Sequence, residues 1–168
     1  MAKVLAMLAS FSFCVYLGLS SSSRLRERDQ ALHLFRRFVR QITISMDYGR
    51  LPLSELIRQS AQGDEALCMI ADDIDRGATA YEAYEAALAE SAGAKAWRAL
   101  TMADHAILSG YFRALGRSDA RAQKEHGLMT VHSLDEAAAE AREAYASRGK
   151  MFRTLGLLLG TAIVILMV

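Results

Sequence analysis

Residues 154–168 read TLGLLLGTAIVILMV and carry no charged side chain. Their large apolar residues would cover the whole circumference of a helix, whereas a helix packed into a globular core keeps a polar stripe. A helix needs about 20 residues to cross roughly 30 Å of hydrocarbon. This segment reaches that length if Phe152 belongs to the span and Arg153 extends its guanidinium back to the interface. The segment therefore predicts a transmembrane helix.

The start of the chain is apolar in the same way. Residues 4–20 are uncharged, and Lys3 is the only charged residue before Arg24. A cleaved secretory signal has a similar apolar core, but no Ala-x-Ala cleavage site follows this one. We therefore favour an uncleaved anchor at residues 1–23. The chain is then a polar body at residues 24–153 between two membrane anchors, the second at residues 154–168.

Positive charge beside the two anchors predicts how the chain sits in the membrane. Cytoplasmic segments next to membrane spans are enriched in Lys and Arg. Each such cation near anionic lipid headgroups adds about 1 kcal/mol of attraction. The rule places the body in the cytoplasm and both termini across the membrane. The cations assigned to the membrane interface are Arg24, Arg26, Arg28, Lys150 and Arg153.

The body has the composition of a helical domain. Pro52 is the only proline of the chain, and good helix formers such as Ala, Leu, Glu and Arg dominate. Apolar residues recur at spacings of three and four, which predicts one buried helix face: Leu32, Phe35, Val39, Ile42 and Met46. Single glycines stand where helices should end: Gly49, Gly63, Gly77, Gly93 and Gly116.

Helix starts are marked as well. Pro52 suits a first helical turn, Asp64 precedes a helix, and Thr79 with Glu82 forms a capping-box pattern. One helix is expected between Gly93 and Gly116. We predict an all-α fold: a six-helix antiparallel bundle whose first and last helices continue into the two terminal transmembrane helices.

Some glycines fall inside the expected helices, at a cost of about 1 kcal/mol each relative to Ala. Gly110 and Gly127 would allow close helix crossing or mark a bend. In the second anchor, Gly156 and Gly160 form a Gly-x-x-x-Gly pair. This pair forms a helix-packing face, either against the first anchor near Gly18 or against another copy of the chain. Alternatively, the two glycines are small residues with no packing role.

Acidic residues concentrate in one stretch of the body: Asp64, Glu65, Asp72, Asp73 and Asp75. They form either a solvated helix face or a docking surface for a basic partner. The two cysteines and four histidines lack the spacing of a metal site, so neither a metal nor a cofactor is expected. A net charge of +1 with interleaved signs argues against nucleic-acid binding.

Several short motifs occur in a characteristic order. They are Met46-Asp47-Tyr48-Gly49, Leu51-Pro52-Leu53-Ser54-Glu55-Leu56, Ala96-Trp97, Asp104, Leu115-Gly116-Arg117-Ser118-Asp119, Gln123, Gly149-Lys150-Met151-Phe152-Arg153 and Leu155-Gly156. In this order, between two apolar ends, they resemble the stage III sporulation protein AB family of endospore-forming bacteria over essentially the whole chain.

The resemblance implies a membrane component of a secretion-like channel complex between mother cell and forespore, with no catalytic activity. It implies a helical domain similar to the cytoplasmic domain of the type II secretion platform protein F. It also implies partnership with a secretion-type ATPase and other stage III sporulation channel proteins. The residues alone predict a membrane-anchored helical adaptor in contact with membrane lipid, and they leave homo-oligomers open.

A membrane-bound enzyme is the alternative from a different class, with Asp104 and His105 as an acid/base pair. Adjacent positions on a helix point about 100° apart, so these two side chains do not converge by themselves. A convergent pocket of titratable groups would favour the enzyme, whereas a solid bundle core would favour the adaptor.

Overall fold

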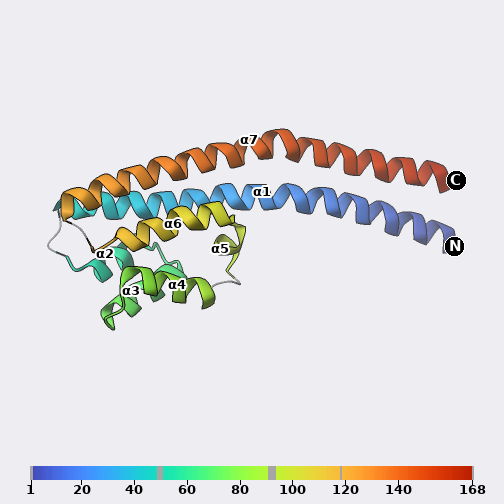
Figure 1. The fold of residues 1–168 in the computed structure, drawn as a ribbon. Helices are drawn as coiled ribbons and strands as arrows, with labels where there is room; N and C mark the ends of the chain where they lie inside the picture. Colours follow the sequence, from blue (N-terminus) through green and yellow to red (C-terminus); the bar gives the residue numbers. More distant parts are fainter. Residues whose placement is uncertain (1, 49–50, 91–93, 118, 168) are drawn as a thin grey trace. The chain divides into compact units, whose positions relative to one another are not determined.

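The computed structural model describes the backbone of residues 2–48, 51–90, 94–117 and 119–167, and the side chains of residues 23–46, 51–90, 94–117, 119, 121–147 and 154. These residues form helices and no strand, which confirms the predicted all-α class (Figure 1). The helices are α1 (Ala2–Tyr48), α2 (Leu53–Ser60), α3 (Glu65–Asp75), α4 (Ala80–Glu90), α5 (Lys95–Ala99), α6 (Met102–Ala114) and α7 (Ala120–Met167).

The described chain thus has seven helices, and the prediction of six was wrong at one place. The single helix expected between Gly93 and Gly116 is divided, because Leu100 adopts an extended conformation between α5 and α6. Thr101 then starts α6 with a capping box. Its hydroxyl accepts from the Asp104 N–H at 3.2 Å, and the Asp104 carboxylate accepts from the Thr101 N–H at 2.8 Å. The spacing of Thr101 and Asp104 was the available signal.

Other predicted helix boundaries are confirmed. Gly63, Gly77 and Gly116 have positive φ where α2, α3 and α6 end. Thr79 and Glu82 form the expected capping box, with the Glu82 carboxylate accepting from the Thr79 N–H at 2.9 Å. Gly49 and Gly93 lie outside the described residues.

Two caps lie within a residue of their predicted places. Pro52 occupies the N-cap of α2 rather than its first turn. Asp64 is the N-cap of α3, and its carboxylate accepts from the Leu67 N–H at 3.1 Å. Both helices therefore begin where their sequence signals indicate.

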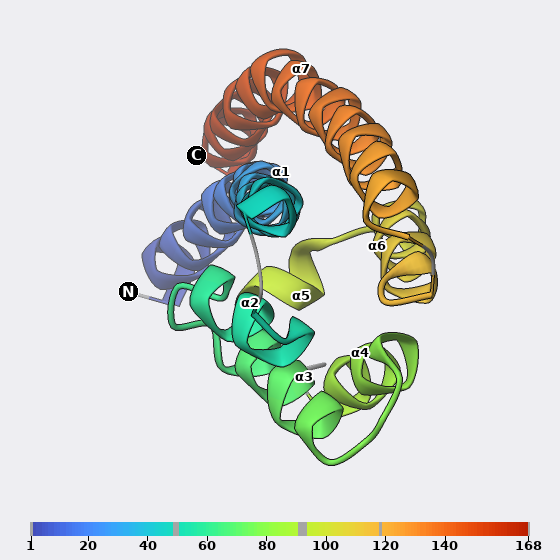
Figure 2. The same ribbon diagram turned by 90° about the vertical axis from the view of Figure 1, so that its left-hand side faces the viewer.

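The chain divides into two compact units: residues 1–29 with 139–168, called the terminal unit here, and residues 30–138, the central unit. In the central unit, α2 packs on α3, α3 on α4 and α4 on α6 (Figure 2). The predicted stripe of α1 forms the centre of the core, since Leu32, Phe35, Val39 and Ile42 are fully buried. Met46 is half-buried at the edge.

A chain of aromatic rings joins four helices of the central unit. Trp97 on α5 meets Phe35 on α1 edge to face, with ring centroids 5.1 Å apart, and lies 5.7 Å from Tyr84 on α4. Tyr84 stacks on Phe112 of α6 at 4.8 Å, and Phe112 stacks on Phe38 of α1 at 6.0 Å. Such pairs add about 0.5–1.5 kcal/mol each beyond their buried area.

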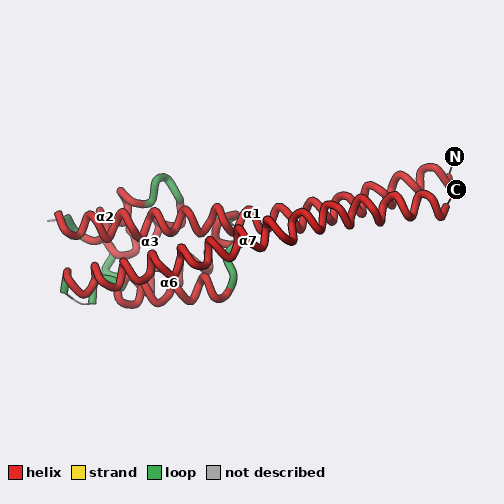
Figure 3. The backbone as a smooth tube through the Cα atoms, turned by 90° about the horizontal axis from the view of Figure 1, so that it is seen from above, coloured by secondary structure: helices red, strands yellow, loops and turns green. Residues whose placement is uncertain are grey.

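In the terminal unit, the first part of α1 and the last part of α7 run antiparallel and side by side, so the two chain ends lie at the same end of the pair (Figures 1 and 3). Two ion pairs join the helices: Arg28 with Glu140 at 3.5 Å and Arg142 with Asp29 at 3.1 Å.

No helix in the described part of the chain has a stretch that is both long and apolar enough to span a membrane. The side chains of residues 2–22 and 155–167 lie outside the described residues, although their backbone is helical. The predicted anchors at residues 1–23 and 154–168 therefore stay predictions, as does the packing assigned to Gly18, Gly156 and Gly160.

Candidate functional site

The acidic residues predicted to dock a partner occupy two places on α3. Asp64 and Glu65 start the helix, whereas Asp72, Asp73 and Asp75 lie in its last turns. At 1.5 Å of rise per residue, the two groups are separated by about 10 Å along the helix axis. The Asp64 carboxylate caps the N-terminus of α3, and Glu65 is exposed. The C-terminal group alone forms a dense acidic surface.

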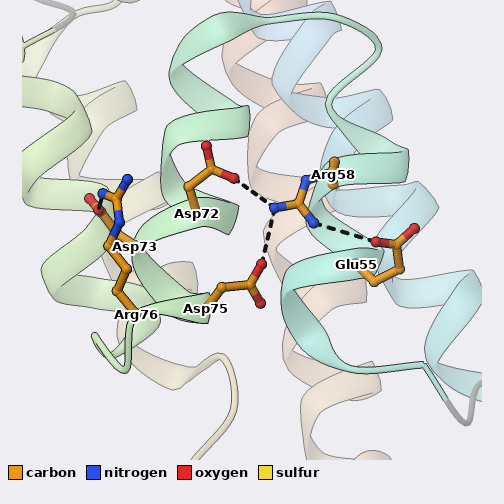
Figure 4. Close-up of polar contacts among 6 residues, drawn as sticks. All are labelled: Glu55, Arg58, Asp72, Asp73, Asp75 and Arg76. Atoms are coloured by element: carbon orange, nitrogen blue, oxygen red, sulfur yellow. Dashed lines mark hydrogen bonds and ion pairs between the residues drawn. The ribbon is translucent and has the colours of Figure 1, made fainter.

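Arg58 of α2 holds this surface together (Figure 4). Its Nη2 donates to Asp72 at 2.6 Å and to Asp75 at 3.0 Å, and its Nη1 donates to Glu55 at 3.4 Å. Asp72 and Asp75 both remain about half exposed. The arginine therefore ties α2 to α3 while leaving carboxylate oxygens available to solvent.

Asp73 belongs to a second pair on the same helix. Arg76 donates to its carboxylate at 2.7 Å, and the Arg76 side chain is 75% exposed. Asp72, Asp73 and Arg76 line a shallow hollow of about 230 Å³ together with Met69 and Glu90 of α4. We call this the acidic hollow, because three of its five side chains are carboxylates.

Hydrogen bonds also shift the pKa values of Asp75 and Arg58. The pKa of Asp75 is lowered from its ordinary 3.8, first by a hydrogen bond from the Ser54 hydroxyl and then by Arg58. The carboxylates of Asp72 and Asp75 raise the pKa of Arg58 above its ordinary value. Asp75 and Arg58 therefore remain charged across the physiological pH range.

Replacing Arg58 by methionine should weaken the acid sensitivity of the fold. Because the pKa of Asp75 is lowered on folding, its contribution to stability is complete above 3.8 and is lost as the pH falls through the lowered value. The melting temperature of the wild-type chain should thus fall more steeply below pH 3.8 than that of the Arg58→Met variant.

A second variant, Asp75→Asn, and an unchanged carboxylate, Glu82, make this comparison specific to the Arg58–Asp75 pair. Asp75→Asn should flatten the dependence of the melting temperature on pH more than Arg58→Met does, because Arg58→Met keeps the hydrogen bond from Ser54. Glu82, whose pKa is lowered by its hydrogen bonds from Thr79, keeps its contribution in all three chains. If the melting temperatures of wild type and Arg58→Met fell in parallel as the pH is lowered, the Arg58–Asp75 pair would have no role in acid stability.

The candidate acid/base pair does not converge. Asp104 is buried, and its carboxylate accepts from the Thr101 N–H in the cap of α6. The His105 ring lies 3.2 Å from both the Tyr84 hydroxyl and the Trp97 carbonyl oxygen, one contact to each ring nitrogen. His105 therefore contacts both α4 and α5, whereas Asp104 caps the start of α6.

The described residues contain no group of three or more His, Cys, Asp or Glu that is arranged to hold a metal ion. Cys68 is a half-buried free thiol. The side chain of Cys14 lies outside the described residues.

The cations assigned to the membrane interface are partly described. Arg24 and Arg26 are exposed, whereas Arg28 is half-buried and paired with Glu140 of α7. The side chains of Lys150 and Arg153 lie outside the described residues. The interface role of all five cations stays a prediction.

Sequence reasoning missed Arg58, the residue that organises the acidic surface. Arg58 and its acidic partners are 14 and 17 residues apart, so no local spacing could pair them. It also missed Arg113 of α6, whose guanidinium carbon lies 4.4 Å from the ring centroid of Tyr81 on α4.

Comparisons with known proteins agree on one relationship. A family model described as stage III sporulation protein AB matches residues 3–168. Stage III sporulation protein AB of Bacillus subtilis (strain 168) is 26% identical over 149 residues, which cover 84% of each chain. A solved structure of stage III sporulation protein AB superposes with a TM-score of 0.61 at 22% identity, covering 71% of this chain and 97% of that one.

Proposed function

The chain belongs to the stage III sporulation protein AB family, and on this premise we propose that it is a membrane-anchored, non-enzymatic adaptor in a secretion-like channel complex between mother cell and forespore. Membership makes it a sporulation protein. The proposal adds the membrane, the adaptor role and the partner, which we take to be a secretion-type ATPase docked on the acidic surface of α3.

The observation that carries the proposal is the antiparallel pair of helix ends in the terminal unit. Because α1 and α7 run in opposite directions there, both apolar segments extend from the same end of the pair (Figure 3). Two such segments can enter one bilayer from one side. The exposed Arg24 and Arg26 lie at the polar end of the first segment, which supports the cytoplasmic placement.

The packing of the central unit supports a structural role over catalysis. Aromatic rings fill its centre, and Asp104 and His105 have structural contacts. A rigid body tethered to a membrane raises the effective concentration of its surface for a partner assembled at the same membrane. An adaptor needs only such a tether and a docking surface.

The docking surface that we propose is the C-terminal end of α3. Asp72 and Asp75 keep about half of their surface exposed although both pair with Arg58. A basic segment of the ATPase would meet carboxylates already fixed in place, so little side-chain entropy is lost on binding.

Reversing the charge of Asp72 and Asp73 to lysine should reduce capture of the ATPase. Like charges across an interface oppose binding, so we expect roughly tenfold less ATPase, which corresponds to about 1.4 kcal/mol. The full tagged chain is expressed with the ATPase. Half of the membranes are washed with alkaline carbonate to test whether the adaptor stays in the bilayer. The other half is solubilised in detergent without that wash, and the amount of ATPase captured per adaptor is measured.

Two control variants separate docking from folding. Glu125→Lys with Glu136→Lys makes the same change in net charge on exposed positions of α7 and should leave capture intact. Arg58→Met removes the tie between α2 and α3 but keeps every carboxylate, so it should lose less capture than the Asp72/Asp73 variant. An adaptor absent from the washed membranes would refute the anchors, and undiminished capture by the Asp72/Asp73 variant would refute the docking surface.

A further inference from the structure

A second hollow lies between the first turn of α4 and the last turn of α6 in the central unit. It encloses about 270 Å³. Phe112 and Leu115, both buried, contribute its apolar lining, and the exposed Arg113 and Arg117 stand around it. We call this the cationic hollow.

The charge of this hollow is not neutralised within the described residues. Arg113 rests on the Tyr81 ring at 4.4 Å, and neither Arg113 nor Arg117 forms an ion pair with a described residue. Glu82 is the one acid that lines the hollow, and its carboxylate accepts from the backbone N–H and the hydroxyl of Thr79. The hollow therefore suits an acidic occupant that also offers an apolar group.

The same chain presents a surface of that chemistry. Outside the residues that line the cationic hollow, the hairpin of α3 and α4 (residues 64–78 and 83–90) carries seven acidic side chains and a single basic one, Arg76. The acidic hollow lies on this hairpin, where the apolar Met69 stands among Asp72, Asp73 and Glu90. Its charge and its apolar centre complement those of the cationic hollow.

We propose that the cationic hollow of one copy receives the acidic hairpin of a second copy of this chain. Because the two surfaces differ, the contact is heterologous: each copy in the contact keeps one of its two surfaces free for a further copy. The copy at the end of such a row also keeps an acidic hollow for a basic partner. The contact requires neither the ATPase nor the membrane, so it goes beyond the function proposed above.

Two charge-reversal variants test the contact. The first, Arg113→Glu with Arg117→Glu, makes the cationic hollow acidic. The second, Asp73→Arg with Glu90→Arg, makes the acidic hollow basic. Each variant alone should lose self-association, because the two surfaces of every copy then carry the same sign and repel.

A mixture of the two variants should recover association. The unchanged acidic hairpin of the first then meets the unchanged cationic hollow of the second, and their reversed surfaces are also complementary. The full chain is expressed with two different tags in a non-sporulating bacterial host, fixed briefly with formaldehyde, and solubilised in detergent. The readout is the amount of one tag captured through the other.

We expect capture by each variant alone to fall roughly tenfold or more below that of the wild type, and the mixture to return most of it. Arg37→Glu with Arg40→Glu, which makes the same charge change on exposed positions of α1, should capture like wild type. Thermal melts followed by circular dichroism confirm that every variant folds.

Three results would overturn the proposal: no self-capture by the wild type, undiminished capture by either variant alone, or no recovery in the mixture. The last would mean that the hollow binds some other acidic protein. Since the host supplies no ATPase of the complex, failure here leaves the docking proposal standing. Undiminished ATPase capture by the Asp72/Asp73 variant, which refutes the docking surface, leaves this proposal standing.

Discussion

Replacing Trp97 by alanine is expected to lower the free energy of unfolding by about 3–5 kcal/mol. The side chain is 1% exposed and packs against Phe35 of α1 and Tyr84 of α4. The loss should be large because α5 has only five residues and no side-chain cap at Ala94. Trp97 is the one buried side chain of α5, so its packing holds this helix in place. Urea denaturation of the full chain in mild detergent, followed by far-ultraviolet circular dichroism, measures the effect.

A phenylalanine at the same position separates packing from the indole N–H. The Trp97 Nε1 atom is buried and has no hydrogen-bond partner among the described residues. Trp97→Phe keeps an aromatic ring against Phe35 and removes this unpaired donor, so its cost should not exceed about 2 kcal/mol. If Trp97→Ala lay within about 1 kcal/mol of wild type, the aromatic chain would not be the centre of the core.

Local pattern was enough to predict most of the fold. The apolar stripe of α1 depends only on the helical repeat, and Leu32, Phe35, Val39 and Ile42 are all buried as expected. Helix ends follow from single residues, such as the glycine at position 77 and the capping box at Thr79. These signals act within one or two helical turns, so a single sequence contains them in full.

The features that sequence reasoning missed depend on contacts between distant segments. The break at Leu100 separates α5 from α6 and allows Trp97 to enter the core. The spacing of apolar residues alone does not distinguish two short helices with such a break from one continuous helix. The acidic residues looked like one patch because they are close in sequence. The structure separates them along α3, and it pairs Asp72 and Asp75 with Arg58, which lies 14 and 17 residues away in sequence.

Gly127 is the point where the sequence indicated a close crossing or a bend, and the structure supports the crossing. A Cβ at this position would lie 2.2 Å from the Thr43 Oγ1 of α1, 3.1 Å from its Cγ2 and 3.2 Å from its Cβ. Thr43 is buried, and its hydroxyl donates to the Val39 carbonyl at 2.7 Å. This bond holds the Thr43 side chain in its rotamer, and a β-branched side chain has few alternative χ1 rotamers in a helix, so room for an added methyl group would cost this bond or a shift of the helices.

Gly127→Ala should therefore destabilise the chain by about 1–3 kcal/mol, although alanine favours a helix over glycine by about 1 kcal/mol. Gly110→Ala is the matched control. Gly110 also lies inside a helix, but nothing stands within 4 Å of its added Cβ, so this change should stabilise the chain by about 0.5–1 kcal/mol. Urea midpoints of the two single variants should thus move in opposite directions.

A second change at Thr43 tests the cause of that loss. Thr43→Ala removes Oγ1 and Cγ2, the two nearest atoms, and leaves Cβ at 3.2 Å, a distance that a small shift accommodates. In the Thr43→Ala background, Gly127→Ala should cost at least about 1 kcal/mol less than in the wild-type chain, because contacting residues couple. Strict additivity of the two changes would show that the crossing of α1 and α7 tolerates a methyl group, and that the glycine serves another purpose in α7.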